Sequence, residues 1–175
     1  MDITDEQIIS YTERVDPVDG YLSVERAAYL AGMVLGDGSK RSSKQVSLCI
    51  AREFDAKILG CLPAYHLKSK SSSSKVDIYT FYGMDVDAWL KPTKRIPDYV
   101  ISEWTVNQKL WLLAGLLDTD GTLENGKVAV FQNTNKELVH QVALLCHTLG
   151  MRTQLKSKQP GGIVTGKHSN FSIFQ

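Results

Sequence analysis

The stretch that decides the fold is residues 113–121, Leu-Ala-Gly-Leu-Leu-Asp-Thr-Asp-Gly, because the chain carries a second version of it. The earlier version is residues 30–38, Leu-Ala-Gly-Met-Val-Leu-Gly-Asp-Gly. Each copy is an apolar helical pattern that contains small residues and is stopped by Asp-Gly. Self-similarity of this kind indicates a chain built from two similar halves.

Small residues recur at helical spacing in both copies. Counting back four at a time from Gly36 gives Gly32 and then Ala28, which places all three on one helix face. Residues this small allow two helices to approach closely. We therefore predict that the two helices pack together through a seam, which consists of Ala28, Ala31, Gly32, Gly36, Ala114 and Gly115.

The pairing would bring two carboxylates together where the helices end. Gly38 and Gly121 are expected in the left-handed conformation that often closes a helix, which leaves Asp37 and Asp120 at the C-termini. An anion there opposes the helix dipole by roughly 0.3–1 kcal/mol, and a divalent cation between the two would reverse the sign. Such carboxylates, with water and phosphate oxygens, suit Mg²⁺. The alternative is an ordinary Asp-Gly turn, which two aligned copies disfavour.

The paired motif resembles LAGLIDADG, the signature of a family of homing endonucleases. Residues 113–121 differ from that signature at two of nine positions, whereas the first copy has Leu35 where the family has its first Asp. Residues 94–97, Lys-Arg-Ile-Pro, and residues 131–134, Phe-Gln-Asn-Thr, resemble further blocks of intein-encoded endonucleases. The resemblance covers roughly residues 22 to 175 and is closest to endonuclease domains of fungal vacuolar-ATPase-type inteins.

This resemblance implies an α+β fold. Two pseudo-symmetric αββαββ half-domains would pack through the motif helices, with saddle-shaped antiparallel sheets facing DNA. The chain then divides into an acidic lead (1–22), a first half-domain with a connecting segment (23–104), and a C-terminally incomplete second half-domain (105–175). Apolar patterning agrees with this order, because it predicts strands at 45–51, 76–82, 127–133, 151–158 and 170–174 and helices at 55–62 and 136–149.

The resemblance also implies a function, which is site-specific double-strand cleavage of DNA by an intein-derived enzyme. Asp37 and Asp120 would bind Mg²⁺, for which Mn²⁺ would substitute, and Lys94 would polarise the scissile phosphate or position the water. The alternative for Lys94 is a solvated basic loop. The implied partner is duplex DNA with a long asymmetric target, bound by a monomer with an internal pseudo-twofold axis, inside the cell and in the nucleus of a eukaryote.

Basic residues gather in segments that would face DNA, although the formal net charge is only +1. For a nucleic-acid-binding protein the distribution of charge matters more than the sum. Leu-Lys-Ser-Lys occurs at 67–70 and again at 155–158, and alternation along a strand puts both lysines of each copy on one face. We predict phosphate contacts, or alternatively a solvated sheet face, for Lys40, Arg41, Lys44, Lys68, Lys70, Lys156 and Lys158.

Two further features of the sequence limit the predicted function. There is no run of about 18 apolar residues, which argues against a membrane span. After Phe174 we find no counterpart of the segment that holds Lys94, so the two active centres are expected to be unequal. A second hypothesis is therefore a non-cleaving nucleic-acid-binding module, either maturase-like or a decayed homing enzyme.

Overall fold

The computed structural model describes residues 24–53, 58, 67–70, 75–82, 84–124, 128–158 and 168–174. Its helices and strands, in chain order, are α2 (Val24–Asp37), β1 (Ser39–Ser42), β2 (Gln45–Ala51), β3 (Leu67–Lys70), β4 (Val76–Tyr82), α4 (Val86–Leu90), α5 (Asp98–Glu103), α6 (Val106–Asp120), β5 (Gly121–Glu124), β6 (Val128–Asn133), α7 (Lys136–Thr148), β7 (Arg152–Lys158) and β8 (His168–Phe174). Within these ranges no helix has the length and apolar character needed to cross a membrane.

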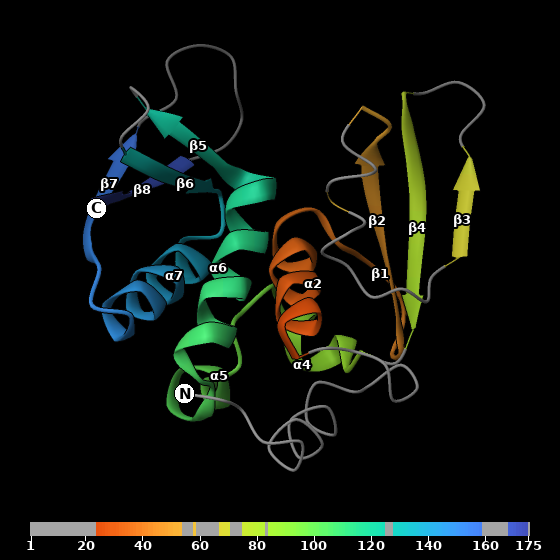
Figure 1. Cartoon of the computed structure of the whole chain (residues 1–175), viewed down its shortest axis with the longest axis horizontal. Coiled ribbons are helices and arrows are strands. Elements are labelled where there is room, and N and C mark those ends of the chain that lie inside the picture. The colour runs from red at the N-terminus through yellow and green to blue at the C-terminus, as the bar shows by residue number, and fades with distance from the viewer. Residues whose placement is uncertain are drawn as a thin grey trace.

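Two four-stranded antiparallel sheets flank a central pair of helices. The sheet orders are β1-β2-β4-β3 and β5-β6-β8-β7, so the second half repeats the topology of the first. Figure 1 shows α2 and α6 side by side, with one sheet on either side of the pair and α7 beside the second sheet. The predicted α+β fold with antiparallel sheets is confirmed. The helix expected at 55–62 lies outside the described residues, apart from Ile58, which is helical.

The strands with clear alternation were predicted accurately, whereas the short polar ones were not. Residues 45–51 and 76–82 form β2 and β4 with the expected bounds. Strands β1 and β5 have four residues each and the sequences Ser-Lys-Arg-Ser and Gly-Thr-Leu-Glu. Because neither carries an apolar face, they form by pairing with β2 and β6 rather than by a pattern of their own.

The two motif helices approach at backbone distance. A Cβ atom added to Gly32 would lie 2.2 Å from the carbonyl oxygen of Leu112, and one added to Gly115 would lie 2.3 Å from that of Tyr29. A Cβ on Gly36 would meet the side chain of Thr119. Any side chain at Gly32 or Gly115 would therefore separate the helices. Of the other predicted seam residues, Ala28 and Ala31 are fully buried and Ala114 is half-buried.

The glycines that end the motifs are not left-handed, so that prediction was wrong. Gly121 has φ −97° and ψ 152°, and among the described glycines the positive φ belongs to Gly150. The structure gives a different reason for glycine. The chain turns from helix into strand so sharply that a Cβ at Gly38 would lie 2.5 Å from the carbonyl oxygen of Val34, and one at Gly121 would lie 2.3 Å from that of Leu117.

The segment between the half-domains is packed into the core. Ile96 and Val100 are buried, and the rings of Trp89 and Trp104 lie 5.8 Å apart. Burial of such large side chains, at about 25 cal/mol per Å² of apolar surface, anchors this segment although residues 91–97 form neither helix nor strand. The anchoring fixes the region of Lys94 relative to both helices.

Candidate active site

The paired helices deliver Asp37 and Asp120 to the same region. Helix α6 begins with a capping box, in which the Thr105 hydroxyl accepts a bond from the Gln108 amide at 3.3 Å and the Gln108 side chain accepts from the Thr105 amide at 2.8 Å. It ends at Asp120, beside the end of α2, because Gly36 and Thr119 are in contact one residue earlier on each helix. The two carboxylates are close enough for the charge on Asp37 to act on the ionisation of Asp120.

Asp120 is half-buried and held from the neighbouring strand. Its Oδ2 accepts a hydrogen bond of 2.6 Å from the side-chain amide of Asn133. Burial raises the pKa of the Asp120 carboxyl above its ordinary value, and the negative charge of Asp37 adds to the rise, while the Asn133 bond and the Lys94 charge oppose it. A carboxylate that is desolvated beside another carboxylate gains from a nearby cation.

Lys94 lies with both carboxylates. Its ammonium group donates a hydrogen bond to the carbonyl of Gly36, in the last turn of α2. Burial lowers the pKa of Lys94, and the charges of Asp120 and Asp37 oppose that shift. The structure therefore brings together the three predicted catalytic residues, and Lys94 is not the solvated loop residue of the alternative interpretation.

A chain of hydrogen bonds connects Asp120 to Lys94. The Asn133 side chain donates to Asp120 and accepts from the Asn135 amide at 2.8 Å, and the Asn135 side chain donates to the Lys94 carbonyl at 2.7 Å. Asn135 also caps α7 by accepting from the Leu138 amide. Sequence reasoning did not single out either asparagine as a site residue, although the Phe-Gln-Asn-Thr block at 131–134 was the available signal.

The motif's first acidic position serves the helix interface. The Tyr29 hydroxyl on α2 donates a 2.6 Å hydrogen bond to Oδ2 of Asp118 on α6. In the first copy Leu35 stands at this position and is fully buried. Only the second acidic position of each copy, at Asp37 and Asp120, therefore faces the candidate site.

The donor set fits a hard divalent cation that keeps most of its water. Among the described residues, no three His, Cys, Asp or Glu side chains gather in a group that could hold a metal. The protein would therefore contribute the carboxylates of Asp37 and Asp120, with water and phosphate oxygens completing the shell. Mg²⁺ is bound in this way, through one or two carboxylates and substrate phosphates.

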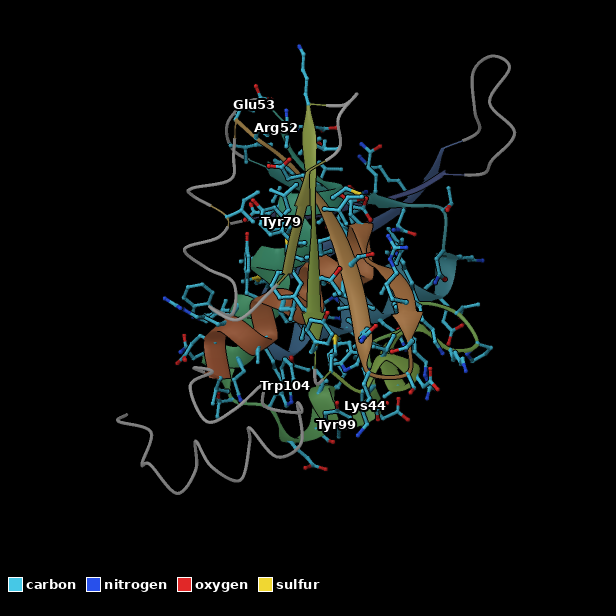
Figure 2. All side chains as sticks on the ribbon, turned by 90° about the vertical axis from the view of Figure 1, so that its right-hand side faces the viewer. Lys44, Arg52, Glu53, Tyr79, Tyr99 and Trp104 are labelled. Carbon is cyan, nitrogen blue, oxygen red and sulfur yellow. The ribbon has the colours of Figure 1, made fainter. Side chains whose placement is uncertain are left out.

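The predicted DNA-contacting residues of the first turn have different surroundings. Lys40 forms an ion pair with Asp87, which also accepts from Lys91 at 3.2 Å. Arg41 donates from Nε to the Ser47 hydroxyl at 2.9 Å, on the first sheet. Lys44 is exposed, and Figure 2 shows it at the end of that sheet opposite Arg52 and Glu53.

The Leu-Lys-Ser-Lys repeat lies in opposite registers in the two sheets. Lys156 pairs with Asn170 on β8, which in turn pairs with Gln132 on β6, and Lys158 pairs with His168. Gln132 is exposed, whereas its neighbour Phe131 faces the core. Lys156 therefore belongs to the outer face, where it is exposed.

In the first sheet the register pairs Lys68 with Tyr79 and Lys70 with Asp77. Tyr79 is part of the core, and Asp77 is buried opposite Ile50. Directly paired positions share a face, so this register places the backbone positions of Lys68 and Lys70 opposite buried residues of β4. This register argues against phosphate contacts by Lys68 and Lys70, but their side chains lie outside the described part of the structure, so the contacts stay a prediction. A repeated tetrapeptide does not fix which strand residues it pairs with.

Comparison with known proteins agrees with this geometry. Residues 107–169 match the model of the LAGLIDADG-like domain. Over 66 residues the chain is 44% identical to the replicative DNA helicase DnaB of Mycobacterium intracellulare, a match that covers 38% of this chain and 11% of the helicase. The chain therefore matches about a tenth of the length of that relative.

Among solved structures, the homing endonuclease I-DmoI in complex with DNA and Ca²⁺ is similar, with a TM-score of 0.57 and 16% identity over 86% of this chain and 83% of that one. The N-terminal LAGLIDADG domain of DUF199/WhiA is similar as well, with a TM-score of 0.55 and 12% identity over 92% of this chain and 82% of that domain. At such identities the likeness concerns the fold. Residues 107–169 thus match a LAGLIDADG-like domain in sequence, and the described part of the chain shares the α+β fold of these two structures.

Proposed function

We propose that this protein is a site-specific DNA endonuclease that hydrolyses phosphodiester bonds with a divalent metal ion. The observation that carries the proposal is the convergence of Asp37, Asp120 and Lys94 where the two motif helices end. Two like charges and a half-buried lysine contribute little to folding there, because Asp120 and Lys94 lose solvation and the two carboxylates repel each other. They are well placed, however, to hold a cation and a phosphate.

Each of the three residues has a distinct role in this proposal. Asp37 and Asp120 would hold Mg²⁺, which when bound activates water and stabilises the leaving oxygen of a phosphodiester. Lys94 lies beside both carboxylates with its ammonium group directed at the end of α2, so a phosphate approaching the helix ends would meet a positive charge in a desolvated setting. Asn133 keeps the Asp120 carboxylate in one orientation.

The outer faces of the two sheets would bind the duplex. Arg41 on the first sheet and Lys156 on the second supply positive charge there. Exposed polar side chains such as Gln132 would read base edges. I-DmoI, which shares the fold, is bound to its target DNA in the similar structures. We propose a long asymmetric target bound by a single chain, whose two half-domains supply both sheets.

An origin within a larger protein is part of the proposal. The chain matches only a small part of a replicative helicase, as expected for an endonuclease domain carried as an insertion in a host protein. This supports an intein-derived enzyme acting inside the cell, while the predicted likeness to fungal vacuolar-ATPase-type inteins stays a prediction.

The experiment begins with the target. Duplexes bound by the protein are selected from a randomised library in Ca²⁺, and the selected DNA is then incubated with Mg²⁺ or Mn²⁺. We expect double-strand cleavage that Asp37→Asn and Asp120→Asn abolish while binding is kept, and that Asp98→Asn, an exposed carboxylate on α5, leaves intact. Cleavage that survives both active-site substitutions would refute the site. Tight binding without cleavage by any variant would instead favour the non-cleaving LAGLIDADG module.

A further inference from the structure

The backbone that carries Lys94 has no helix or sheet to hold it. Residues 91–97 form no regular element, yet Lys94 must keep its ammonium group beside Gly36 and two carboxylates. The first half-domain contributes backbone bonds near its ends: the Lys91 amide donates to the Asp87 carbonyl at 3.2 Å, and the Arg95 amide donates to the Trp89 carbonyl at 2.9 Å. The polar backbone groups of Lys94 and Ile96 are instead bonded by side chains of helix α7 and its cap.

Two side chains of the second half-domain form hydrogen bonds with the backbone of residues 94 and 96, on either side of Arg95. Gln141 accepts from the Ile96 amide at 2.8 Å and donates to the Ile96 carbonyl at 3.2 Å, which satisfies both polar groups of one residue. Asn135 donates to the Lys94 carbonyl at 2.7 Å. Ile96 is only 1% exposed, so its backbone groups have little access to water and losing the Gln141 bonds would leave them unsatisfied.

We propose that Gln141, together with Asn135, is a positioning residue that holds Lys94 in the active site from the second half-domain. The inference rests on the proposed function. Lys94 follows the first half-domain in sequence, but its own carbonyl and the backbone of Ile96 are bonded by α7 and its cap, which belong to the second half-domain. The lysine is therefore in place only when the two half-domains are docked, and the site is completed by the same packing that pairs the motif helices.

The test compares two glutamines that make the same bond. Gln141→Ala removes a 2.8 Å bond to the amide of Ile96, and Gln108→Ala removes a 2.8 Å bond to the amide of Thr105 at the far end of α6. Both should lower thermal stability. Only Gln141→Ala should lower the single-turnover cleavage rate constant, by about 10–100-fold, as is typical when a group that orients a catalytic residue is lost. The dissociation constant for DNA should be unchanged.

A double-substitution cycle separates positioning from general damage. If Gln141 acts through Lys94, adding Gln141→Ala to Lys94→Met should cause no further loss of rate, because residues that act as one unit are not additive. Gln141→Glu, which can still accept from Ile96 but cannot donate to it, should give an intermediate rate. Additive losses, or equal losses for Gln141→Ala and Gln108→Ala, would overturn the proposal.

One measurement does not depend on cleavage. Hydrogen exchange of the Ile96 amide should be faster in Gln141→Ala than in the wild-type protein and unchanged in Gln108→Ala. If the wild-type protein cleaves no DNA, the proposed function fails, and Ile96 exchange still decides whether Gln141 holds the segment. Unaltered exchange in Gln141→Ala would reject the positioning role whatever the activity.

Discussion

The ends of the two motif helices differ although their sequences repeat. Asp37 is exposed, whereas Asp120 is half-buried and accepts a hydrogen bond from Asn133. Asn133 lies twelve residues after Gly121, and the same count from Gly38 leads to Ile50, which is buried in the core. The second strand after each motif, β2 or β6, therefore decides how tightly the carboxylate of that motif is held.

The last turn of the helix pair shows a second difference. Gly36 leaves space that the Thr119 side chain fills, and the Thr119 hydroxyl donates back to the carbonyls of Gly115 and Leu116. Duplicated helices thus pack by complementarity, with a small residue in one copy facing a larger one in the other. The repeat specifies the pairing, and its differences specify the environment of each acid.

Separating the two motif helices would remove both helix ends from the site, so it should have the largest effect on stability. Gly115→Ala places a Cβ 2.3 Å from the Tyr29 carbonyl oxygen, an atom of the backbone that cannot move aside. We expect a loss of unfolding free energy at or above the upper end of the range of about 1–3 kcal/mol seen for overpacked cores, measured by urea denaturation. Leu110→Ala, on the same helix and 40% exposed, should change stability by less than about 0.5 kcal/mol.

Loss of the hydrogen bond from Asn133 to Asp120, which Asp37 has no equivalent of in the described structure, should have the next largest effect, on the cleavage rate. Asn133→Leu, which imitates the apolar residue of the first half, should lower the rate of metal-dependent cleavage by about 10–100-fold while the protein stays folded. Replacing Gln132, the exposed neighbour on the same strand, by leucine should leave the rate constant for cleavage of bound DNA unchanged. A fully active Asn133→Leu would show that the two ends are equivalent after all.

The opposite registers of the repeated lysines predict a smaller difference, in salt dependence. Lys156→Ala should reduce the slope of log binding constant against log salt concentration by about 0.9, as expected for one lost phosphate contact. Lys68→Ala should not alter it, because its position pairs with the buried Tyr79. Equal reductions by the two variants would place both copies of the repeat against DNA.

The pH dependence of stability gives the smallest effect. Burial raises the pKa of Asp120, so the folded state binds the proton of this carboxyl more tightly than the unfolded state does. The stability that the bound proton confers is present at acidic pH and is lost as the pH rises through the folded-state pKa of Asp120. Asp120→Asn never ionises, so its Tm should exceed that of the wild type at about pH 7 and the gap should close below about pH 4. A difference in Tm that stays constant between about pH 4 and pH 7 would contradict a raised pKa of Asp120. Asp98→Asn, which removes an exposed carboxylate, provides the control.

Much of the fold and the central site could be predicted from the sequence. The motif copies specify the helix pair because Gly32 and Gly115 allow backbone contact, and alternation in 45–51 and 76–82 specifies two strands. Strands β1 and β5 were missed because their order comes from pairing. The register of residues 67–70, and the link from Asn133 through Asn135 to Lys94, depend on tertiary geometry that a local pattern does not contain.

The central claim is that Asp37 and Asp120 jointly hold a divalent metal at the paired helix ends. The most direct measurement is anomalous diffraction from Mn²⁺ in a crystal of the protein bound to its selected duplex. We predict Mn²⁺ within inner-sphere distance of both carboxylates and of a phosphate oxygen, and none at this place in a crystal of Asp120→Asn with Asp37→Asn. Anomalous density elsewhere, or a duplex cleaved with no metal at these two residues, would contradict the account.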